Sequence, residues 1–212
     1  MVGFLKTFLP KYRGLAQNEM ENYGNYIIYS ATVSEVELDV LTGEMKINRV
    51  DILEDTGTSV NPEVDVGQVE GAFVMSLGMW LTEQMRYDPE TGRLLTHDTW
   101  EYKVPSSKDI PQDFRVAFHD SKRNTQAGVF GSKAVGEQSF LMGVSVILAL
   151  RRAIDAVKRD LGQNPLPFYS LGTQDSFINN VVVQFFFSFS DGPATPEKLQ
   201  MTTGVTAEHF IL

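Results

Sequence analysis

The stretch that decides the fold of this chain is a turn of small residues leading into a long apolar segment, Gly131-Ser132-Lys133-Ala134-Val135-Gly136-Glu137-Gln138-Ser139-Phe140. Gly131 and Gly136 permit backbone angles, and a close approach of a ligand, that a side chain would prevent. The segment that follows predicts a helix over about 138–161, and the free N–H groups at its start can hold an anion or the polar edge of a cofactor. Glu137 brings a carboxylate to this point, and it is our first candidate for a functional residue.

Composition limits the class of protein. The chain has 212 residues, of which 42% are hydrophobic, enough to bury a core of about one domain. Its net charge of −9 argues against a nucleic-acid or anionic-membrane partner, because both require an excess of Lys and Arg. Cysteine is absent, which excludes disulfides and thiolate-ligated zinc or iron–sulfur centres in this chain and is compatible with a reducing compartment. The first ten residues lack the apolar core and cleavage site of a signal peptide.

Alternating apolar residues predict strands over 26–40 and 45–53, joined by the turn at 41–44 into a hairpin. Shorter strands are expected near 94–95 and 100–104, and 114–118 should return to the sheet. Asn61 and Pro62 predict the start of a helix that continues to about Trp80 and is buried on most sides, with Gly67 and Gly71 implying a close neighbour.

The helix after the small-residue turn contains an apolar run of eleven residues, too short to cross a bilayer, and should end at Gly162. Thr195 and Pro196 predict the start of a further helix. The expected fold class is therefore α+β, with mixed or antiparallel strands packed against two long buried helices.

Several familiar sites are not predicted by the sequence. The three histidines, His97, His119 and His209, do not have the spacing of metal ligands. The glycines at 128 and 131 lie too close together for a phosphate-binding loop, and there is no nucleophile elbow.

Glu137 and Gln68 remain as candidates, and each has an ordinary alternative. A Glu in the first turn of a helix often only complements the helix dipole, and a Gln in a first turn is often solvated or part of a cap. Ser132 and Lys133 would by default be ordinary loop residues.

The order of several strings resembles that of the xanthine dehydrogenase/aldehyde oxidase family of molybdenum hydroxylases. The strings are Asp55-Thr56-Gly57 through Asn61-Pro62, Asp65-Val66-Gly67-Gln68-Val69-Glu70-Gly71-Ala72-Phe73, Tyr102-Lys103-Val104-Pro105, Ile110-Pro111 with Phe114-Arg115-Val116, and Ser132-Lys133-Ala134-Val135-Gly136-Glu137. The resemblance is to the last part of the molybdopterin-binding domain and is close over residues 20–162. It implies that 1–212 is the C-terminal part of such a domain, with a molybdenum-molybdopterin cofactor.

The resemblance also implies roles for individual residues. Glu137 matches the family's active-site base, and Gln68 matches a glutamine that contacts the cofactor. Val135 matches a residue that contacts the cofactor through its backbone, and its neighbours Ala134 and Gly136 are expected to contribute to the same contact.

Within the family, residues 87–96 followed by Trp100 resemble the aldehyde oxidase branch, and Gln138-Ser139 stands where xanthine dehydrogenases usually have Pro-Pro. The expected substrate is a small aldehyde or N-heterocycle, with a purine substrate as the alternative. Complete family members also carry 2Fe–2S clusters and FAD, whose domains are absent here, and they are cytoplasmic homodimers.

Two departures from the family affect these expectations. The chain begins near the middle of a cofactor domain, so a fragment is expected, inactive in isolation. Residues 172–190 look like an insertion between family elements, which we interpret as a translated intron, followed by a C-terminal tail at 193–212. Alternatives from other classes are an inert remnant that only packs against a partner, or an acidic interaction module.

Overall fold

The computed structural model describes residues 2–8, 12–13, 26–119, 130–164 and 193–205. The strands are β1 (Val2–Phe8), β2 (Tyr12–Arg13), β3 (Ile27–Ile28), β4 (Ser30–Leu38), β5 (Met45–Glu54) and β6 (Asp113–Phe118). The helices are α1 (Pro62–Leu77), α2 (Gly136–Met142), α3 (Val144–Asp160) and α4 (Pro196–Thr203), and a π-helical turn, η1 (Gly78–Thr82), extends α1. None of the described helices is both long and apolar enough to span a lipid bilayer.

The main sheet is mixed and has the strand order β1-β4-β5-β6. The predicted hairpin is confirmed, because β4 and β5 pair antiparallel. Glu35 pairs with Arg49 and Val36 with Ile47, which leaves Asn48 as the additional residue of a bulge. Ile47 and Val50 both face the core although they are three residues apart, because the bulge shifts the alternation. The segment at 114–118 returns as β6, parallel to β5, as expected.

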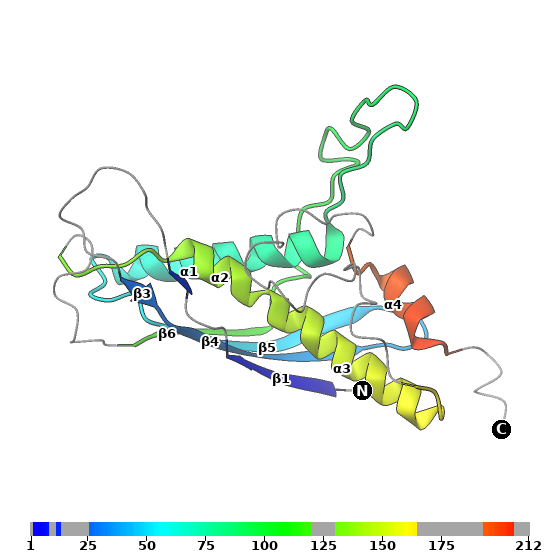
Figure 1. The fold of residues 1–212 in the computed structure, drawn as a ribbon, viewed down its shortest axis with the longest axis horizontal. Coiled ribbons are helices and arrows are strands. Elements are labelled where there is room, and N and C mark those ends of the chain that lie inside the picture. The colour runs from blue at the N-terminus through cyan, green and yellow to red at the C-terminus, as the bar shows by residue number, and fades with distance from the viewer. Residues whose placement is uncertain (1, 9–11, 14–25, 120–129, 165–192, 206–212) are drawn as a thin grey trace.

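The helices lie on one face of the sheet, and the core fills the space between the two layers (Figure 1). Val36 and Ile52 from the sheet pack there with Phe73 of α1 and Leu150 of α3. The ring of Phe73 lies 5.3 Å from that of Phe114, centroid to centroid, and joins α1 to β6. The predicted α+β class, with a mixed sheet packed against helices, is confirmed.

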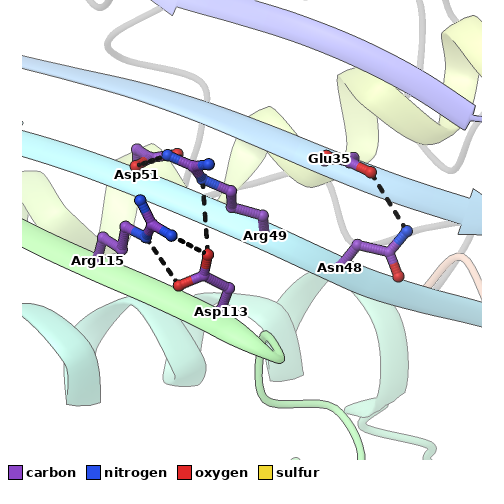
Figure 2. Close-up of polar contacts among 6 residues, drawn as sticks. All are labelled: Glu35, Asn48, Arg49, Asp51, Asp113 and Arg115. Carbon is purple, nitrogen blue, oxygen red and sulfur yellow. Dashed lines mark hydrogen bonds and ion pairs between the residues drawn. The ribbon is translucent and has the colours of Figure 1, made fainter.

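The other face of the sheet carries charges (Figure 2). Arg49 and Asp51 of β5 lie opposite Asp113 and Arg115 of β6, so each charge has an opposite charge across the strands. Arg115 Nη2 lies 2.6 Å from Asp113 Oδ2, and Arg49 Nε lies 2.6 Å from Asp51 Oδ2. All four side chains are between 39% and 57% exposed, so this face meets solvent in the described chain.

The start of α1 follows the prediction. The side chain of Asn61 accepts a hydrogen bond from the Val64 N–H, and Pro62 occupies the first helical position. The expectation that this helix is buried on most sides is wrong, because Val64 and Met75 are 56% and 65% exposed. The physical reason is that the sheet and α2 cover only one side of α1 in the described chain.

The single helix predicted over 138–161 is instead two helices that meet at Gly143. A Cβ atom at Gly143 would lie 2.2 Å from Ser76 Oγ, so α1 packs directly against the backbone at this junction. The predicted end is confirmed, since Gly162 adopts φ +69° just after α3.

The prediction of short strands near 94–95 and 100–104 is wrong. Residues 83–112 instead form an excursion that projects from the end of α1 (Figure 1), where only an isolated bridge joins Tyr87 to Leu94. The hydroxyl of Tyr102 donates to Glu83 Oε2 at 2.6 Å, so the returning part of the excursion is hydrogen-bonded to its first residue. Strand β1 is an element that the sequence did not predict.

The predicted helix start at Thr195 and Pro196 is confirmed by α4, whose first turn is capped by the Thr195 hydroxyl. Helix α4 lies against the β4–β5 turn, since a Cβ atom at Gly43 would lie 1.7 Å from the Pro196 oxygen. The proposed insertion at 172–190 lies outside the described residues.

Candidate functional site

The small-residue turn at 131–135 lies on a second turn, at 55–58, that connects β5 to α1. The Thr58 N–H donates to the Gly131 carbonyl at 2.9 Å, and the Lys133 N–H donates to the Thr56 carbonyl at 2.9 Å. Gly57 has φ +67°, and a Cβ atom there would lie 2.2 Å from the Gly131 oxygen. Glycine is required at this position both for the backbone angle and for the close approach.

A buried ion pair joins the same two turns. Lys133 Nζ donates to Asp55 Oδ2 at 2.6 Å, and the two side chains are 4% and 7% exposed. Asp55 also accepts from the Gly57 N–H through its other oxygen, at 3.1 Å. The default expectation that Lys133 is an ordinary loop residue is therefore wrong: it anchors the turn that precedes α2.

The first turn of α2 separates inward from outward side chains. Gln138 and Ser139 are buried and point toward the end of β5, whereas Glu137 is exposed. The carboxylate of Glu54 accepts hydrogen bonds from Gln138 Nε2 and from Ser139 Oγ, the latter at 2.6 Å. Burial raises the pKa of Glu54 to about 7, although these two hydrogen bonds act in the opposite direction.

Helix α1 brings Gln68 to the same place. The Oε1 atom of Gln68 lies 3.8 Å from the position that a Cβ atom on Gly136 would occupy, and apart from the chain neighbours and the backbone of α2 itself no other described atom lies within 4 Å of that position. The backbone at Gly136 is therefore open on the side where Gln68 stands. Gln68 in the middle of α1 and Gly136 at the start of α2, which are 68 positions apart, thus lie side by side, with Glu137 next in the chain.

The surface of α1 beside this point has no cover among the described residues. Val64, Gly67, Gln68, Gly71 and Met75 follow one side of the helix and are all exposed. Cβ atoms at Gly67 and Gly71 would meet nothing within 4 Å in the described chain, so it does not supply the close neighbour that the two glycines predicted.

The remaining candidates lie in the turn itself. Ala134 is exposed, and its N–H donates to the Tyr26 hydroxyl at 3.2 Å. Val135 is half-buried and packs against the core, while its carbonyl accepts from Ser139 Oγ at 3.0 Å. Among the residues singled out from the sequence, the structure therefore places Gln68 beside Gly136, and Ala134, Val135 and Glu137 are the chain neighbours of Gly136.

These residues fit a polar cofactor of the kind that the resemblance implies. The space over Gly136 would be filled by a Cβ atom, Gln68 Oε1 of α1 borders it, and the exposed Glu137 is the next residue in α2. Gln68 can donate and accept hydrogen bonds, and the backbone at 134–136 can approach a ligand because position 136 has no side chain.

Sequence reasoning missed the polar residues beneath this surface. Glu54 continues the inward alternation of Val50 and Ile52, so a carboxylate at the next core position was the available signal. In the sequence, its partners Gln138 and Ser139 mark only a difference between family branches, and Asp55 is only the first residue of a family string.

A separate acidic group lies on the excursion. His97, Asp98 and Glu101 could offer ligand atoms within 4.8 Å of one another. His97 and Asp98 are exposed, and the distance from His97 Nε2 to Asp98 Oδ2 is 3.9 Å. This group is remote in sequence from the turn at 131–137 and adds nothing to that site.

Comparison with known proteins defines the class. The model of the molybdopterin cofactor-binding domain matches residues 4–111, and the chain belongs to this family. The match begins at residue 4, upstream of the region in which the sequence strings were apparent.

Individual relatives carry the names of both expected branches. The chain is 37% identical to the xanthine dehydrogenase/oxidase of Rattus norvegicus over 93% of its own length and 13% of that protein. It is 40% identical to aldehyde oxidase 1 of Cavia porcellus over 65% of its length and 10% of that protein. The chain thus spans only 10–13% of the length of these relatives.

Solved structures share the fold. Quinoline 2-oxidoreductase from Pseudomonas putida 86 matches 85% of this chain and 19% of its own, with a TM-score of 0.62 at 22% identity. The aldehyde oxidoreductase from Desulfovibrio gigas matches 84% of this chain and 16% of its own, with a TM-score of 0.58 at 20% identity. The resemblance to the xanthine dehydrogenase/aldehyde oxidase family is confirmed.

Proposed function

We propose that this chain forms one wall of the cofactor site of a molybdenum hydroxylase, with Glu137 as the general base. Gln68 and the backbone of Ala134, Val135 and Gly136 are the proposed cofactor contacts. The observation that carries the proposal is the position of Gln68 Oε1 beside the open backbone of Gly136, next to an exposed Glu137. Membership of the molybdopterin cofactor-binding family supplies the chemical class of the ligand.

When bound, the molybdenum cofactor supplies oxygen transfer to an electrophilic carbon and takes up two electrons. Conversion of an aldehyde and water to a carboxylic acid also releases protons, and in this proposal the Glu137 carboxylate accepts one. A general base must lie within hydrogen-bond reach of the proton that it removes. The turns at 55–58 and 131–135 are joined by three described hydrogen bonds, including the buried Lys133–Asp55 pair, and these fix the backbone that leads into Glu137.

Gln68 has a complementary role in the proposal. Its amide can hydrogen-bond the polar edge of the cofactor, while the missing side chain at Gly136 lets that edge lie against the main chain. The exposed side of α1, with Gly67 and Gly71, is the surface that the rest of the cofactor site would cover.

The preferred substrate class is a small aldehyde, because residues 87–96 and Gln138-Ser139 resemble the aldehyde oxidase branch. A purine is the second candidate, and it is favoured by the match of the rat xanthine dehydrogenase/oxidase over 93% of this chain. The complete protein is proposed to be a cytoplasmic homodimer that also carries 2Fe–2S clusters and FAD on segments outside this chain.

The experiment uses the complete protein that contains this chain. Molybdenum per protomer is measured first, followed by kcat/KM for a set of aldehydes and for xanthine under the same conditions. The proposal expects stoichiometric molybdenum and turnover of one of the two substrate classes. A folded complete protein without molybdenum would contradict it and would favour an inert remnant.

A further inference from the structure

We propose that Glu54 is a positioning residue for the backbone of Ala134 and Val135, acting through the side chains of Gln138 and Ser139. The inference deepens the proposed function, on which its catalytic part rests. It concerns a buried carboxylate on β5 that touches neither cofactor nor substrate. Its effect would reach Glu137 through the two residues that follow Glu137 in α2.

The contact begins with Glu54 at the end of β5. Its side chain is fully buried, and its two oxygens have different partners in the first turn of α2. Oε1 accepts from Gln138 Nε2, and Oε2 accepts from Ser139 Oγ at 2.6 Å. A single carboxylate thus joins the sheet to two consecutive residues of the helix.

The same two side chains turn back to the residues before the helix. Gln138 Nε2 donates to the Ala134 carbonyl at 2.6 Å, and Ser139 Oγ lies 3.0 Å from the Val135 carbonyl. An amide nitrogen has two hydrogens, so Gln138 can serve Glu54 and Ala134 together, whereas the single hydroxyl hydrogen of Ser139 must be shared. Gln138 is therefore the principal bridge between Glu54 and the turn.

The hydrogen bonds that run from Glu54 through Gln138 and Ser139 fix the backbone at 134–135 more closely than apolar packing would. Apolar side chains of similar size could fill the same volume without fixing where the carbonyls of Ala134 and Val135 point. Hydrogen bonds to a buried carboxylate are directional and are costly to leave unmade, so they hold the turn in one arrangement. Ala134 and Val135 are the residues whose backbone is proposed to meet the cofactor.

The charge state of Glu54 affects this bridge. An ionised Glu54 carboxylate accepts hydrogen bonds from both Gln138 and Ser139. In the protonated form one of its oxygens carries a hydrogen, so that oxygen becomes a donor. Burial raises the pKa of Glu54, and the nearby carboxylates of Asp65 and Asp55 add to the effect. Lys133 Nζ donates to Asp55, the residue that follows Glu54 in the chain.

The first arm of the test uses the 212-residue chain without cofactor. Glu54→Met removes both acceptors, and Glu54→Gln keeps the shape with one acceptor oxygen. Ile52→Val is the control, because it weakens the core from the same strand without contacting α2 by a hydrogen bond. Hydrogen exchange is measured for the amides of residues 140–142 in α2 and of the central turns of α3.

Glu54→Met is expected to accelerate exchange in α2 by at least about tenfold relative to α3, with a smaller acceleration in Glu54→Gln. Ile52→Val is expected to change both helices by a similar factor. If Glu54→Met changes α2 and α3 equally, Glu54 is only a core residue and the inference is overturned. If the Met variant does not fold, the Gln variant decides by the same comparison.

The second arm uses the complete enzyme. Glu54→Gln is expected to lower kcat at least about threefold while molybdenum content and KM stay near their original values, and Ile52→Val is expected to leave kcat unchanged. Unchanged kcat in Glu54→Gln, with faster exchange in α2, would overturn the catalytic part of the inference. If Glu137→Gln keeps full turnover, the proposed function fails, and the exchange result still decides whether Glu54 holds the turn.

Discussion

Lys133 and Asp55 are 78 positions apart in the sequence and form a buried ion pair, with 2.6 Å between Nζ and Oδ2. The pair closes the contact between the β5–α1 turn and the turn before α2. Helix α1, which contains Gln68, follows the first turn, and α2, which begins at Gly136, follows the second. The relative position of α1 and α2 at this end therefore depends on two charges that solvent hardly reaches.

Lys133→Met is expected to destabilise the protein by about 3–5 kcal/mol, because it leaves the Asp55 carboxylate buried without its cation. The free energy of unfolding from urea titrations measures the effect. Arg115→Met is the control, since it breaks an exposed pair with Asp113 on the open face of the sheet (Figure 2). It should cause little measurable change, and a Lys133 variant that behaves in the same way would contradict the role given to the buried pair.

Gly57→Ala tests the close contact between the two turns. Gly57 and Gly92 have almost the same backbone angle, with φ +67° and +68°, but an added Cβ meets the Gly131 oxygen at 2.2 Å only at position 57. Gly92→Ala should cost about 1 kcal/mol, from the backbone angle alone. Gly57→Ala should cost more, and its melting temperature should fall further. Equal losses in the two variants would show that the turns are not in close contact.

The pH dependence of stability tests the environment of Glu54. Its pKa is about 7 in the folded chain, above the ordinary value of 4.5, so the folded state holds a proton that the unfolded state releases between these values. Stability should therefore fall as the pH rises from about 4.5 to 7, by up to about 3 kcal/mol from this group, and then level off.

Glu54→Gln removes this contribution, because the amide does not titrate. The difference in unfolding free energy between the variant and the original chain should grow in favour of the variant as the pH rises from 5 to 8, measured by urea titration at each pH. A difference that stays constant across this range would mean that Glu54 ionises at an ordinary pKa.

Local sequence patterns predicted the elements whose form depends on nearby residues. Alternation gave β4 and β5, and the Asn61–Pro62 and Thr195–Pro196 pairs marked the starts of α1 and α4. The strands expected near 94–95 and 100–104 failed because a strand also needs an available sheet edge, which this excursion lacks in the described chain. The break at Gly143 was missed because its cause, the contact with Ser76, is a tertiary one.

Only some of the residues around Gly136 were predicted, because the others depend on tertiary contacts. Gln68, Ala134, Val135, Gly136 and Glu137 were singled out through family strings, and the structure places them together. Glu54 was missed because its partners Gln138 and Ser139 are 84 and 85 positions away, and no local pattern links a strand end to a helix start at that distance. Long-range polar pairs of this kind become visible only in the folded chain.

The central claim is that the Glu137 carboxylate acts as the base beside a cofactor held by Gln68 and the 134–136 backbone. The most direct measurement is the rate at which substrate reduces the molybdenum centre in a single turnover of the complete Glu137→Gln enzyme, with molybdenum content determined on the same sample. We predict unchanged molybdenum and a rate lower by at least about 100-fold, the loss expected for a general base. A rate close to that of the original enzyme, at full molybdenum content, would contradict the assignment of Glu137.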